Sequence, residues 1–225
     1  MFERTSLLIG EDKLNKIRNL NILVLGVGGV GGYSIETLVR SGVENITLVD
    51  YDTIDITNLN RQLISNNNNI GKYKVEEFKK RILSINNNVK VNTIKDKISK
   101  DNINILFEDN YDYIIDACDT IEVKKELIKI CKEKDINLIT VCGMGKKLDP
   151  SKVKVCDIRD TSYDPIAKIL RKYVKEEKIK GKVVCISSIE QPINNDKNIT
   201  SSMMMVPSVA GILAASYIIN KTIKE

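Results

Sequence analysis

The sequence predicts an α/β fold of the doubly wound kind, in which helices cover both faces of a mainly parallel sheet. Short apolar runs typical of buried strands alternate along the chain with longer segments whose apolar residues recur every three or four positions. A glycine-rich turn, residues 26–32, stands between the first of these runs and the helix that follows it. Of the 225 residues, 42% are hydrophobic and 29% are charged, a composition that suits one globular domain.

The first predicted elements follow one another closely. Residues 7–17 place apolar side chains at helical spacing among charges, which indicates a short amphipathic helix. Residues 21–27 (NILVLGV) are a buried strand, residues 31–42 a helix that ends at a glycine, and residues 46–50 (ITLVD) a second strand. This order of strand, glycine turn, helix and strand is typical of a nucleotide-binding unit.

The alternation continues as far as residue 142. After a polar loop, the predicted elements are, in chain order, helix 72–85, strand 89–94, short helix 101–109, strand 111–117, helix 121–134 and strand 136–142. Helices of this length between strands imply parallel pairing with right-handed crossovers.

The spacing of the elements changes after Met144. Residues 152–158 and 182–188 are predicted strands, and a lysine-rich helix over 164–180 separates them. Residues 203–219 are the most apolar segment of the chain. That segment contains a proline and is shorter than the stretch of about 20 apolar residues that a bilayer span needs, so we interpret it as a buried helix.

We expect the whole chain, residues 1–225, to be one domain. Residues 1–143 would be its nucleotide-binding core, and residues 144–225 a mixed or antiparallel extension of the same domain. A chain of this length can bury one sizeable core, and it suits one elaborated domain better than two independent ones.

Charge and cysteine content narrow the class of protein. The formal net charge of +5 permits a polyanionic partner such as RNA without identifying one. The five cysteines are odd in number and no two are separated by only two residues, which argues against a disulfide scaffold and against a CxxC zinc site. Charges occupy the start of the chain, where a signal peptide needs an apolar run, so we expect a cytoplasmic protein.

The glycine turn predicts a phosphate-binding loop. Gly26, Gly28 and Gly31 fit the pattern G-x-G-x-x-G, with Gly29 between them, and Asp50 follows about 20 residues later at the end of the next strand. Free N–H groups at the helix start attract phosphate, and Asp50 can accept hydrogen bonds from ribose. The set predicts a Rossmann-like fold. It serves NAD and ATP equally, and a glycine turn needed only for packing remains an alternative.

The loop DYDTIDITNLNRQ follows the second strand and carries four polar candidates. They are Asp52, Asn58, Arg61 and Gln62. The carboxyl ends of the strands are where ligands of open sheets bind. An arginine there suits an enzyme that breaks a triphosphate, because it can stabilise charge that moves among the phosphates. The alternative interpretation is an ordinary salt bridge in an exposed loop.

Three further charged residues extend this pattern. Lys74 falls in the first turn of a predicted helix, where a cation is unfavourable unless an anion binds beside it, and solvated Lys72 and Lys74 are the alternative. Asp116 and Asp119 close the run IIDACDT. We prefer Asp119 as a ligand of Mg²⁺, because it lies outside the strand, and we interpret Asp116 as a structural hydrogen-bond acceptor.

Together these motifs resemble a known superfamily. GVGGVGG, LVDYDTIDITNLNRQ, GKYKVEE and DACDT are similar to the motifs of the ubiquitin-activating-type adenylating enzymes, which include the activators of molybdopterin and thiamin sulfur carriers. Within that superfamily the chain is most similar to the tRNA threonylcarbamoyladenosine dehydratase branch, through its start, its end and the segment GMGKKLDPSKVKVCDIRDTSYDPIAKILR. The resemblance covers nearly the whole chain.

The resemblance implies a single adenylating domain and an enzyme of the ligase or cyclase type that uses ATP and Mg²⁺. In that branch the carboxylate of the threonylcarbamoyl group on a tRNA adenosine attacks the α-phosphate and becomes an acyl-adenylate. A nucleophile of the same modification then closes a ring and expels AMP, with net loss of water. The implied nucleic-acid partner is tRNA that carries threonylcarbamoyladenosine, and no DNA partner is expected.

The resemblance also implies roles for individual residues. Asp50 would bind the ribose, Asn58, Arg61 and Lys74 the phosphates, and Asp119 the Mg²⁺. The other residues implied in nucleotide binding are Gly26, Gly28, Gly29, Gly31, Asp52 and Gln62. Arg4 matches an arginine that the partner subunit supplies in this superfamily, which implies a homodimer.

Other functions remain open at the level of sequence. The runner-up is an adenylyltransferase that activates the C-terminus of a ubiquitin-like sulfur carrier. Many such enzymes hold zinc through CxxC pairs that this chain lacks, so no zinc is expected. Cys185 could form a thioester, although a buried cysteine is the plainer interpretation. A regulatory nucleotide-binding protein and a hydride-transferring enzyme rank lower. Binding of a monovalent cation and of a sulfur-relay partner is left open.

The lysine-rich helix predicts a contact with tRNA. Its cations lie mostly on one broad face and could meet phosphates: Lys168, Arg171, Lys172, Lys175 and Lys178. Tyr163 and Tyr173 are the aromatic residues near them. No other aromatic residue suited to stacking is evident, so recognition of bases cannot be argued from the sequence.

Overall fold

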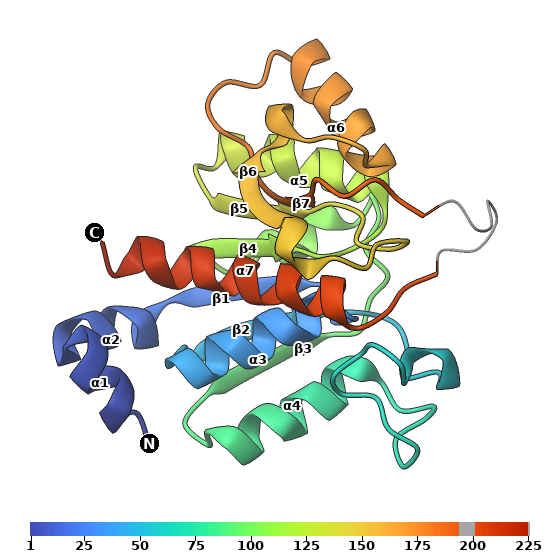
Figure 1. Cartoon of the computed structure of the whole chain (residues 1–225). Coiled ribbons are helices and arrows are strands. Elements are labelled where there is room, and N and C mark those ends of the chain that lie inside the picture. Colours follow the sequence, from blue (N-terminus) through green and yellow to red (C-terminus); the bar gives the residue numbers. More distant parts are fainter. Residues whose placement is uncertain (194–200, 225) are drawn as a thin grey trace.

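A single seven-stranded sheet forms the centre of the molecule (Figure 1). The computed structural model describes residues 1–193 and 201–224. The strands are β1 (Asn21–Leu25), β2 (Asn45–Val49), β3 (Lys90–Ile94), β4 (Tyr113–Asp116), β5 (Asn137–Val141), β6 (Val153–Asp157) and β7 (Val184–Ser188). Their order in the sheet is β3-β2-β1-β4-β5-β7-β6, and every neighbouring pair is parallel except β6 with β7. The predicted α/β sheet with a mixed extension is confirmed.

Helices and 3-10 turns connect these strands and cover both faces of the sheet (Figure 1). The α-helices are α1 (Glu3–Ile9), α2 (Glu11–Asn19), α3 (Gly31–Ser41), α4 (Lys74–Ile85), α5 (Ile121–Glu133), α6 (Pro165–Glu176) and α7 (Met205–Thr222). The 3-10 helices are η1 (Ile56–Asn58), η2 (Ile103–Phe107), η3 (Pro150–Lys152) and η4 (Ile158–Asp160).

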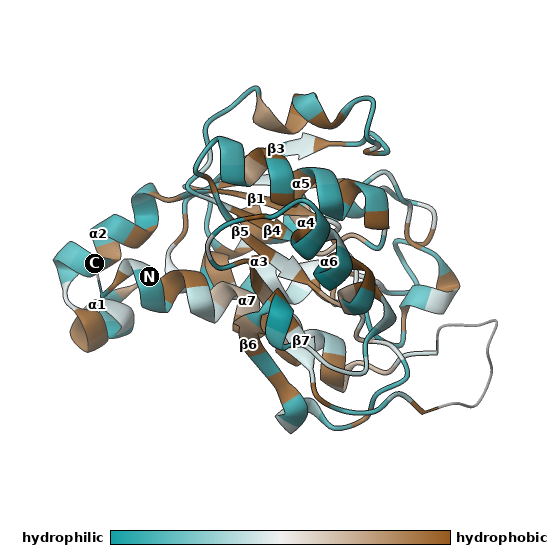
Figure 2. Ribbon diagram, turned by 90° about the horizontal axis from the view of Figure 1, so that it is seen from above, coloured by the Kyte–Doolittle hydropathy of each residue, from teal (hydrophilic) through white to brown (hydrophobic). Residues whose placement is uncertain are grey.

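The two faces of β1 show how one strand supports two cores. Successive side chains of a strand point to opposite faces. Ile22 and Val24 pack into the core that α3, α4 and α7 cover, whereas Leu23 and Leu25 pack into the core that η2 and α5 cover. Because both faces are covered, the strand is a continuous apolar run without polar alternation. In Figure 2 the central strands are mostly brown, and α5 and α6 also carry teal residues.

The register of the sheet brings three strand ends together. Leu25 of β1 lies beside Val49 of β2 on one side and beside Asp116 of β4 on the other. The chain runs to β2 on one side of β1 and later to β4 on the other, so the loops that follow these strands diverge and leave a crevice. This switch point determines where the loops with the predicted polar residues lie.

Several predicted boundaries differ from the structure. The helix predicted over residues 7–17 is two helices, α1 and α2, because Gly10 adopts a left-handed φ of +87° between them. The short helix predicted over 101–109 is the 3-10 turn η2, and the lysine-rich helix ends at Glu176, four residues before the predicted end. Helix α7 extends to Thr222. In the described parts of the chain, no helix is both long and apolar enough to cross a membrane.

The segment after residue 143 continues the sheet of the core. Strand β7 pairs with β5 in parallel, and β6 pairs with β7 in the antiparallel direction as the edge strand. Helix α7 returns across the sheet and packs on α3 and on β6. The extension therefore also supports the helix that begins at the glycine turn.

Candidate active site

A cavity of about 300 Å³ opens at the carboxyl ends of β1, β2 and β4. Most of the site residues predicted from the sequence line it. They are Gly26, Gly28, Asp50, Asp52, Asn58, Arg61, Gln62, Lys74 and Asp119. The structure therefore brings together residues from four separate segments of the chain. Gly29, Gly31 and Arg4 do not line the cavity.

The glycine turn lets α3 begin directly at this cavity. Gly26 has a φ of +84°, and a Cβ there would lie 2.8 Å from the carbonyl oxygen of Ala117. A Cβ on Gly31 would collide with the carbonyl of Gly26, so the turn can close only with glycine at both places. Gly29 lies against Arg61 and Pro207. The N-terminal end of a helix offers unpaired N–H groups and positive potential, which favour a phosphate.

Asp50 stands at the end of β2 and is held by the two loops beside it. Its Oδ2 accepts a hydrogen bond from the Val27 N–H at 2.9 Å, and its Oδ1 accepts one from the Asp52 N–H at 2.9 Å. Burial raises the pKa of Asp50, while Lys74 and the two N–H groups act in the opposite direction. Each carboxylate oxygen retains a lone pair, so Asp50 can also accept from the hydroxyls of a ribose.

Lys74 is a buried cation and not a solvated one. It is 4% exposed, and its Nζ lies 2.8 Å from Oδ2 of Asp52. The backbone N–H of Lys74 also donates to the carbonyl of Asp52, at 3.1 Å. The alternative of a solvated side chain is therefore wrong for Lys74, whereas Lys72 is exposed. A fixed cation at the cavity wall suits an anionic ligand.

The loop after β2 presents Arg61 to the cavity. Asp55 caps η1 through the Thr57 N–H, and Asn58 Oδ1 accepts from the Asp55 N–H at 3.1 Å. Arg61 then donates from Nη1 to the Thr57 carbonyl at 2.7 Å and to Asn60 Oδ1 at 3.0 Å. A guanidinium has about five N–H donors, so most of those of Arg61 remain for a ligand.

Gln62 follows Arg61 and lines the cavity with a buried amide. The residue is 8% exposed, and its Oε1 has no hydrogen-bond partner within residues 1–193 and 201–224. A buried acceptor without a partner is costly unless a ligand or water completes it.

Asp116 and Asp119 lie in different surroundings. Asp116 is fully buried, receives a hydrogen bond of 2.6 Å from Thr140 Oγ1 and lies 3.0 Å from Lys124 Nζ, which makes it a structural acceptor. Asp119 lies beyond the end of β4, exposed at the cavity. Within the described residues no three His, Cys, Asp or Glu side chains form a metal cluster. A metal at Asp119 would thus need ligands from phosphate and water.

Lys124 is a site-supporting residue that sequence reasoning missed. Its Nζ is fully buried and also donates to the Val141 carbonyl at 2.9 Å, so it joins the ends of β4 and β5. Its position in the sequence could have indicated its burial, because it shares the buried face of α5 with Val123, Leu127 and Ile128. A lysine on the apolar face of a helix needs an anionic partner.

Arg4 lies on α1, outside the lining of the cavity in its own chain. It is exposed, and α1 has no buried residue and packs against α2 (Figure 1). Leu7 and Leu8 on the same helix are 82% and 83% exposed.

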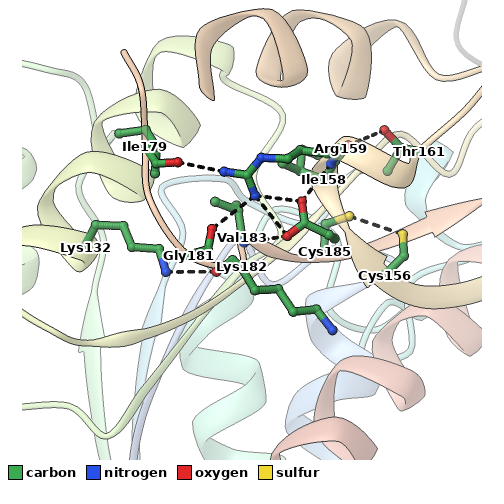
Figure 3. A network of polar contacts seen from close by, with 11 residues as sticks. Lys132, Cys156, Ile158, Arg159, Thr161, Ile179, Gly181, Lys182, Val183 and Cys185 are labelled. Atoms are coloured by element: carbon green, nitrogen blue, oxygen red, sulfur yellow. Dashed lines mark hydrogen bonds and ion pairs between the residues drawn. The ribbon is translucent and has the colours of Figure 1, made fainter. Parts of the chain in front are cut away.

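Cys185 has the environment of a core residue. It is fully buried on β7, and its Sγ lies 3.5 Å from that of Cys156 on β6 (Figure 3). Hydrogen bonds with Cys142 and Cys156, together with burial, raise the pKa of Cys185. A thioester requires an accessible thiolate, so this geometry favours a structural role for Cys185.

The cations of the extension are not equivalent. Arg159 donates to Asp157 and to the carbonyls of Ile179 and Gly181, which ties the chain after α6 to η4 (Figure 3). Arg171 donates to the carbonyl and hydroxyl oxygens of Thr161. Lys168, Lys172 and Lys175 recur at helical spacing and are exposed, whereas Lys178 lies beyond the end of α6. The face available to phosphates is therefore narrower than predicted.

Comparisons of the sequence and of the structure with known proteins lead to the same family. Residues 2–224 match the ThiF family. A Bacillus subtilis protein named tRNA threonylcarbamoyladenosine dehydratase is 39% identical over 100% of this chain and 95% of its own length. Two crystal structures of the Escherichia coli tRNA N6-threonylcarbamoyladenosine dehydratase, TcdA, superpose with a TM-score of 0.92 at 34% identity. The complex with AMP covers 98% of this chain and 93% of that one, and the complex with ATP covers 99% and 93%.

Proposed function

Because this chain belongs to the ThiF family, we propose that it is an enzyme that uses ATP to dehydrate and cyclise threonylcarbamoyladenosine in tRNA. The observation that carries the proposal is the cavity that gathers the glycine turn, a ribose acceptor and two cations at one edge of the sheet. Similarity over the full length to dehydratases, including structures with AMP and with ATP, supports the same activity. In this proposal residues 1–225 act as one adenylating domain.

The reaction has two balanced steps. A carboxylate oxygen of the threonylcarbamoyl group attacks the α-phosphorus of ATP, and pyrophosphate leaves, so an acyl-adenylate forms. A nucleophile of the same modified nucleoside then attacks the acyl carbon, loses its proton and expels AMP as the ring closes. The oxygen lost from the carboxylate leaves in AMP, which accounts for the net loss of water. The second step is intramolecular and benefits from high effective concentration.

The residues of the cavity divide the binding of ATP between them. Asp50 accepts from the ribose, and the turn from Gly26 to Gly31 brings the start of α3 to the phosphates. Arg61 and Lys74 supply positive charge where negative charge increases on the α-phosphate and on the departing pyrophosphate. The loop is held by Asn58 and Asp52, and Gln62 completes the polar wall of the cavity. Gly29 packs against Arg61.

Asp119 suits a bound Mg²⁺. Mg²⁺ usually takes one or two carboxylates and completes its shell with water and phosphate oxygens, and Asp119 is an exposed carboxylate at the cavity. A bound Mg²⁺ would neutralise phosphate charge. Among the described residues that line the cavity, Cys118 has the one side chain of the thiol or imidazole kind that zinc prefers, and burial raises the pKa of its thiol.

A homodimer would complete the site with Arg4. Leu7 and Leu8 expose nearly all of their apolar surface on α1, next to Arg4, and such a surface favours an interface. In the proposed dimer the partner subunit provides its copy of this arginine to the cavity.

The proposed function is tested by direct conversion of the nucleoside. We expect the protein, ATP, Mg²⁺ and tRNA bearing threonylcarbamoyladenosine to give a nucleoside lighter by one water, with AMP and pyrophosphate in equal amounts. Nucleoside mass spectrometry measures the product. If pyrophosphate exchange instead requires a carrier protein that ends in Gly-Gly and ignores tRNA, the sulfur-carrier function replaces this one.

The role of Asp119 is tested by its dependence on Mg²⁺. Asp119→Ala should raise the Mg²⁺ concentration for half-maximal rate by roughly 10–100-fold, since a contact with a charged group contributes about 1.5–3 kcal/mol. The matched control is Asp96→Ala, which removes an exposed carboxylate from the β3 side of the same cavity. Equal Mg²⁺ requirements of the two variants would rule out Asp119 as a ligand.

A further inference from the structure

Tyr163, in the turn before α6, combines an exposed ring with an unusual backbone. Its φ is +59°, and the residue is 60% exposed. A bulky side chain rarely adopts the left-handed region, because its Cβ crowds the backbone, so the surrounding structure must hold Tyr163 there. Hydrophobic burial does not offset this strain, because the residue is mostly exposed to solvent. The conformation therefore presents the ring outward at a conformational cost.

Two buried residues anchor the turn on either side of Tyr163. Thr161 accepts two hydrogen bonds from Arg171, to its carbonyl oxygen at 2.7 Å and its hydroxyl at 2.6 Å, and it donates to the Ile158 carbonyl at 2.7 Å. Asp164 accepts from the Ala167 N–H at 2.7 Å and so caps α6. With both ends held, Tyr163 has little freedom to fold back onto the protein.

The same anchors place Tyr163 at the edge of the sheet that carries the active site. Buried Lys147 lies 3.7 Å from Oδ2 of Asp164 and donates to the Gly143 carbonyl at 2.6 Å. Gly143 follows the end of β5, and β5 pairs with β4, beyond which Asp119 lies. The start of α6 thus lies near the end of β5, at the same edge of the sheet as the cavity, and Figure 1 shows α6 next to α5.

Among the described residues, no cation is found over the ring of Tyr163, which distinguishes this ring from those of other exposed tyrosines. Two other strongly exposed tyrosines have cations over their rings, Tyr51 with Lys97 at 5.3 Å and Tyr73 with Lys95 at 5.2 Å. Tyr173 of α6 is half-buried, and Lys125 of α5 lies 5.8 Å from the centre of its ring. Within the described residues no such contact covers Tyr163.

Exposed lysines continue from Tyr163 along α6. Lys168, Lys172 and Lys175 share one side of the helix. Proteins that bind single-stranded nucleic acid combine cations that follow the phosphates with aromatic rings that stack on bases. Unpaired bases in RNA loops are recognised in this way.

We propose that Tyr163 stacks on an unpaired base of the tRNA substrate, while the lysines of α6 contact the phosphates next to that base. The inference rests on the proposed function, because it assigns the exposed ring to the tRNA. It makes Tyr163 a substrate-positioning residue that acts on tRNA and not on ATP.

The test uses the full-length protein and end-labelled tRNA bearing threonylcarbamoyladenosine. Tyr163→Gly should raise the Kd for this tRNA by about 5–150-fold, the effect of losing one base-stacking contact. KM for tRNA should rise with it, while the Kd for ATP stays unchanged. Glycine adopts a φ of +59° without strain, so Tyr163→Gly should have a Tm equal to or above that of the parent protein. A loss of binding would therefore not reflect a loss of folding.

Matched variants separate base stacking from effects of the backbone and of charge. Tyr163→Phe keeps the ring and should bind tRNA as the parent does. Asp135 lies between α5 and β5, is exposed and also has a left-handed backbone, with a φ of +54°. Asp135→Gly removes the backbone strain there and should leave tRNA binding unchanged. Lys172→Glu should weaken binding and flatten its salt dependence, whereas Tyr163→Gly should keep the salt slope of the parent.

The outcomes that overturn the inference are distinct from failure of the proposed function. Parental tRNA affinity in Tyr163→Gly, or an equal loss in Tyr163→Phe, would show that the ring does not stack. If the parent protein itself neither binds nor dehydrates the tRNA, the proposed function fails instead.

Discussion

Arg61→Ala is expected to lower the rate of tRNA dehydration by about 10²–10³-fold, the effect of removing one preorganised charge stabiliser from an active site. Arg61 lines the cavity, and its two hydrogen bonds to Thr57 and Asn60 orient the guanidinium before ATP arrives. Negative charge moves from the carboxylate onto the phosphates as pyrophosphate leaves. The decrease in rate should therefore appear mainly in the formation of the acyl-adenylate. Single-turnover conversion followed by nucleoside mass spectrometry measures the rate.

Two companion variants make this result specific. Arg40→Ala removes an exposed arginine of α3 that pairs with Glu36 at 2.7 Å, and it should leave the rate unchanged. Arg61→Lys keeps the charge but loses the planar fork, so an intermediate rate is expected. Arg61 would lose its assigned role if its alanine variant exchanged pyrophosphate into ATP as fast as the parent protein.

Lys124→Met is expected to lower the free energy of unfolding by about 3–5 kcal/mol, because removal of one partner leaves the other as an uncompensated buried charge. Lys124 and Asp116 are both fully buried, with 3.0 Å between Nζ and Oδ2. The variant should also weaken ATP binding, because Lys124 joins the end of β4 to the Val141 carbonyl of β5. Urea denaturation measures the first effect, and titration with ATP the second.

The neighbouring lysine provides the control. Lys125→Met removes a cation that pairs with Glu122 at the surface, at 2.9 Å, and should change stability by less than about 1 kcal/mol. The double variant Lys124→Met with Asp116→Asn should regain part of the lost stability, since no unpaired charge stays buried. A loss in Lys124→Met no larger than that in Lys125→Met would contradict the assigned role of the pair.

The pH dependence of stability follows from the same pair. Burial alone would lower the pKa of Lys124, but Asp116 outweighs it and the pKa is raised above the usual value for lysine. A lysine whose pKa is higher in the folded than in the unfolded protein stabilises the folded state. This stabilisation is fully present at pH values below the pKa of the unfolded state, and it is lost as the pH rises through the pKa of the folded state. The contribution of Lys124 to stability should therefore be constant through neutral pH and be lost in strongly alkaline solution, which urea denaturation at a series of pH values measures.

Local sequence pattern predicted most of the nucleotide site. Gly26 and Gly31 could be recognised because their spacing is set by one turn, and Asp50 because it ends the next strand. These residues are near each other in the chain, so strand and helix periodicity alone determines their relative positions. Asp116 and Asp119 could likewise be distinguished by whether they lie within or beyond β4.

Backbone conformation and contacts between separate segments explain what sequence reasoning missed. The break at Gly10 depends on its left-handed φ of +87°, which hydrophobic spacing does not reveal. The buried state of Lys74 depends on Asp52, which is 22 residues away. Arg171 looked like a surface cation until the fold brought Thr161 beneath it.

By itself the sequence determined the order of strands and helices, the phosphate-binding turn and the family, since each depends on side-chain identity within a short window. Only the tertiary structure decided which charges are buried, which cations of α6 are exposed, and that Tyr163 is exposed with a left-handed backbone. The reason is physical: the burial and partners of a side chain depend on residues from other segments of the chain, such as Lys147 for Asp164 and Asp52 for Lys74, which come together only when the chain folds.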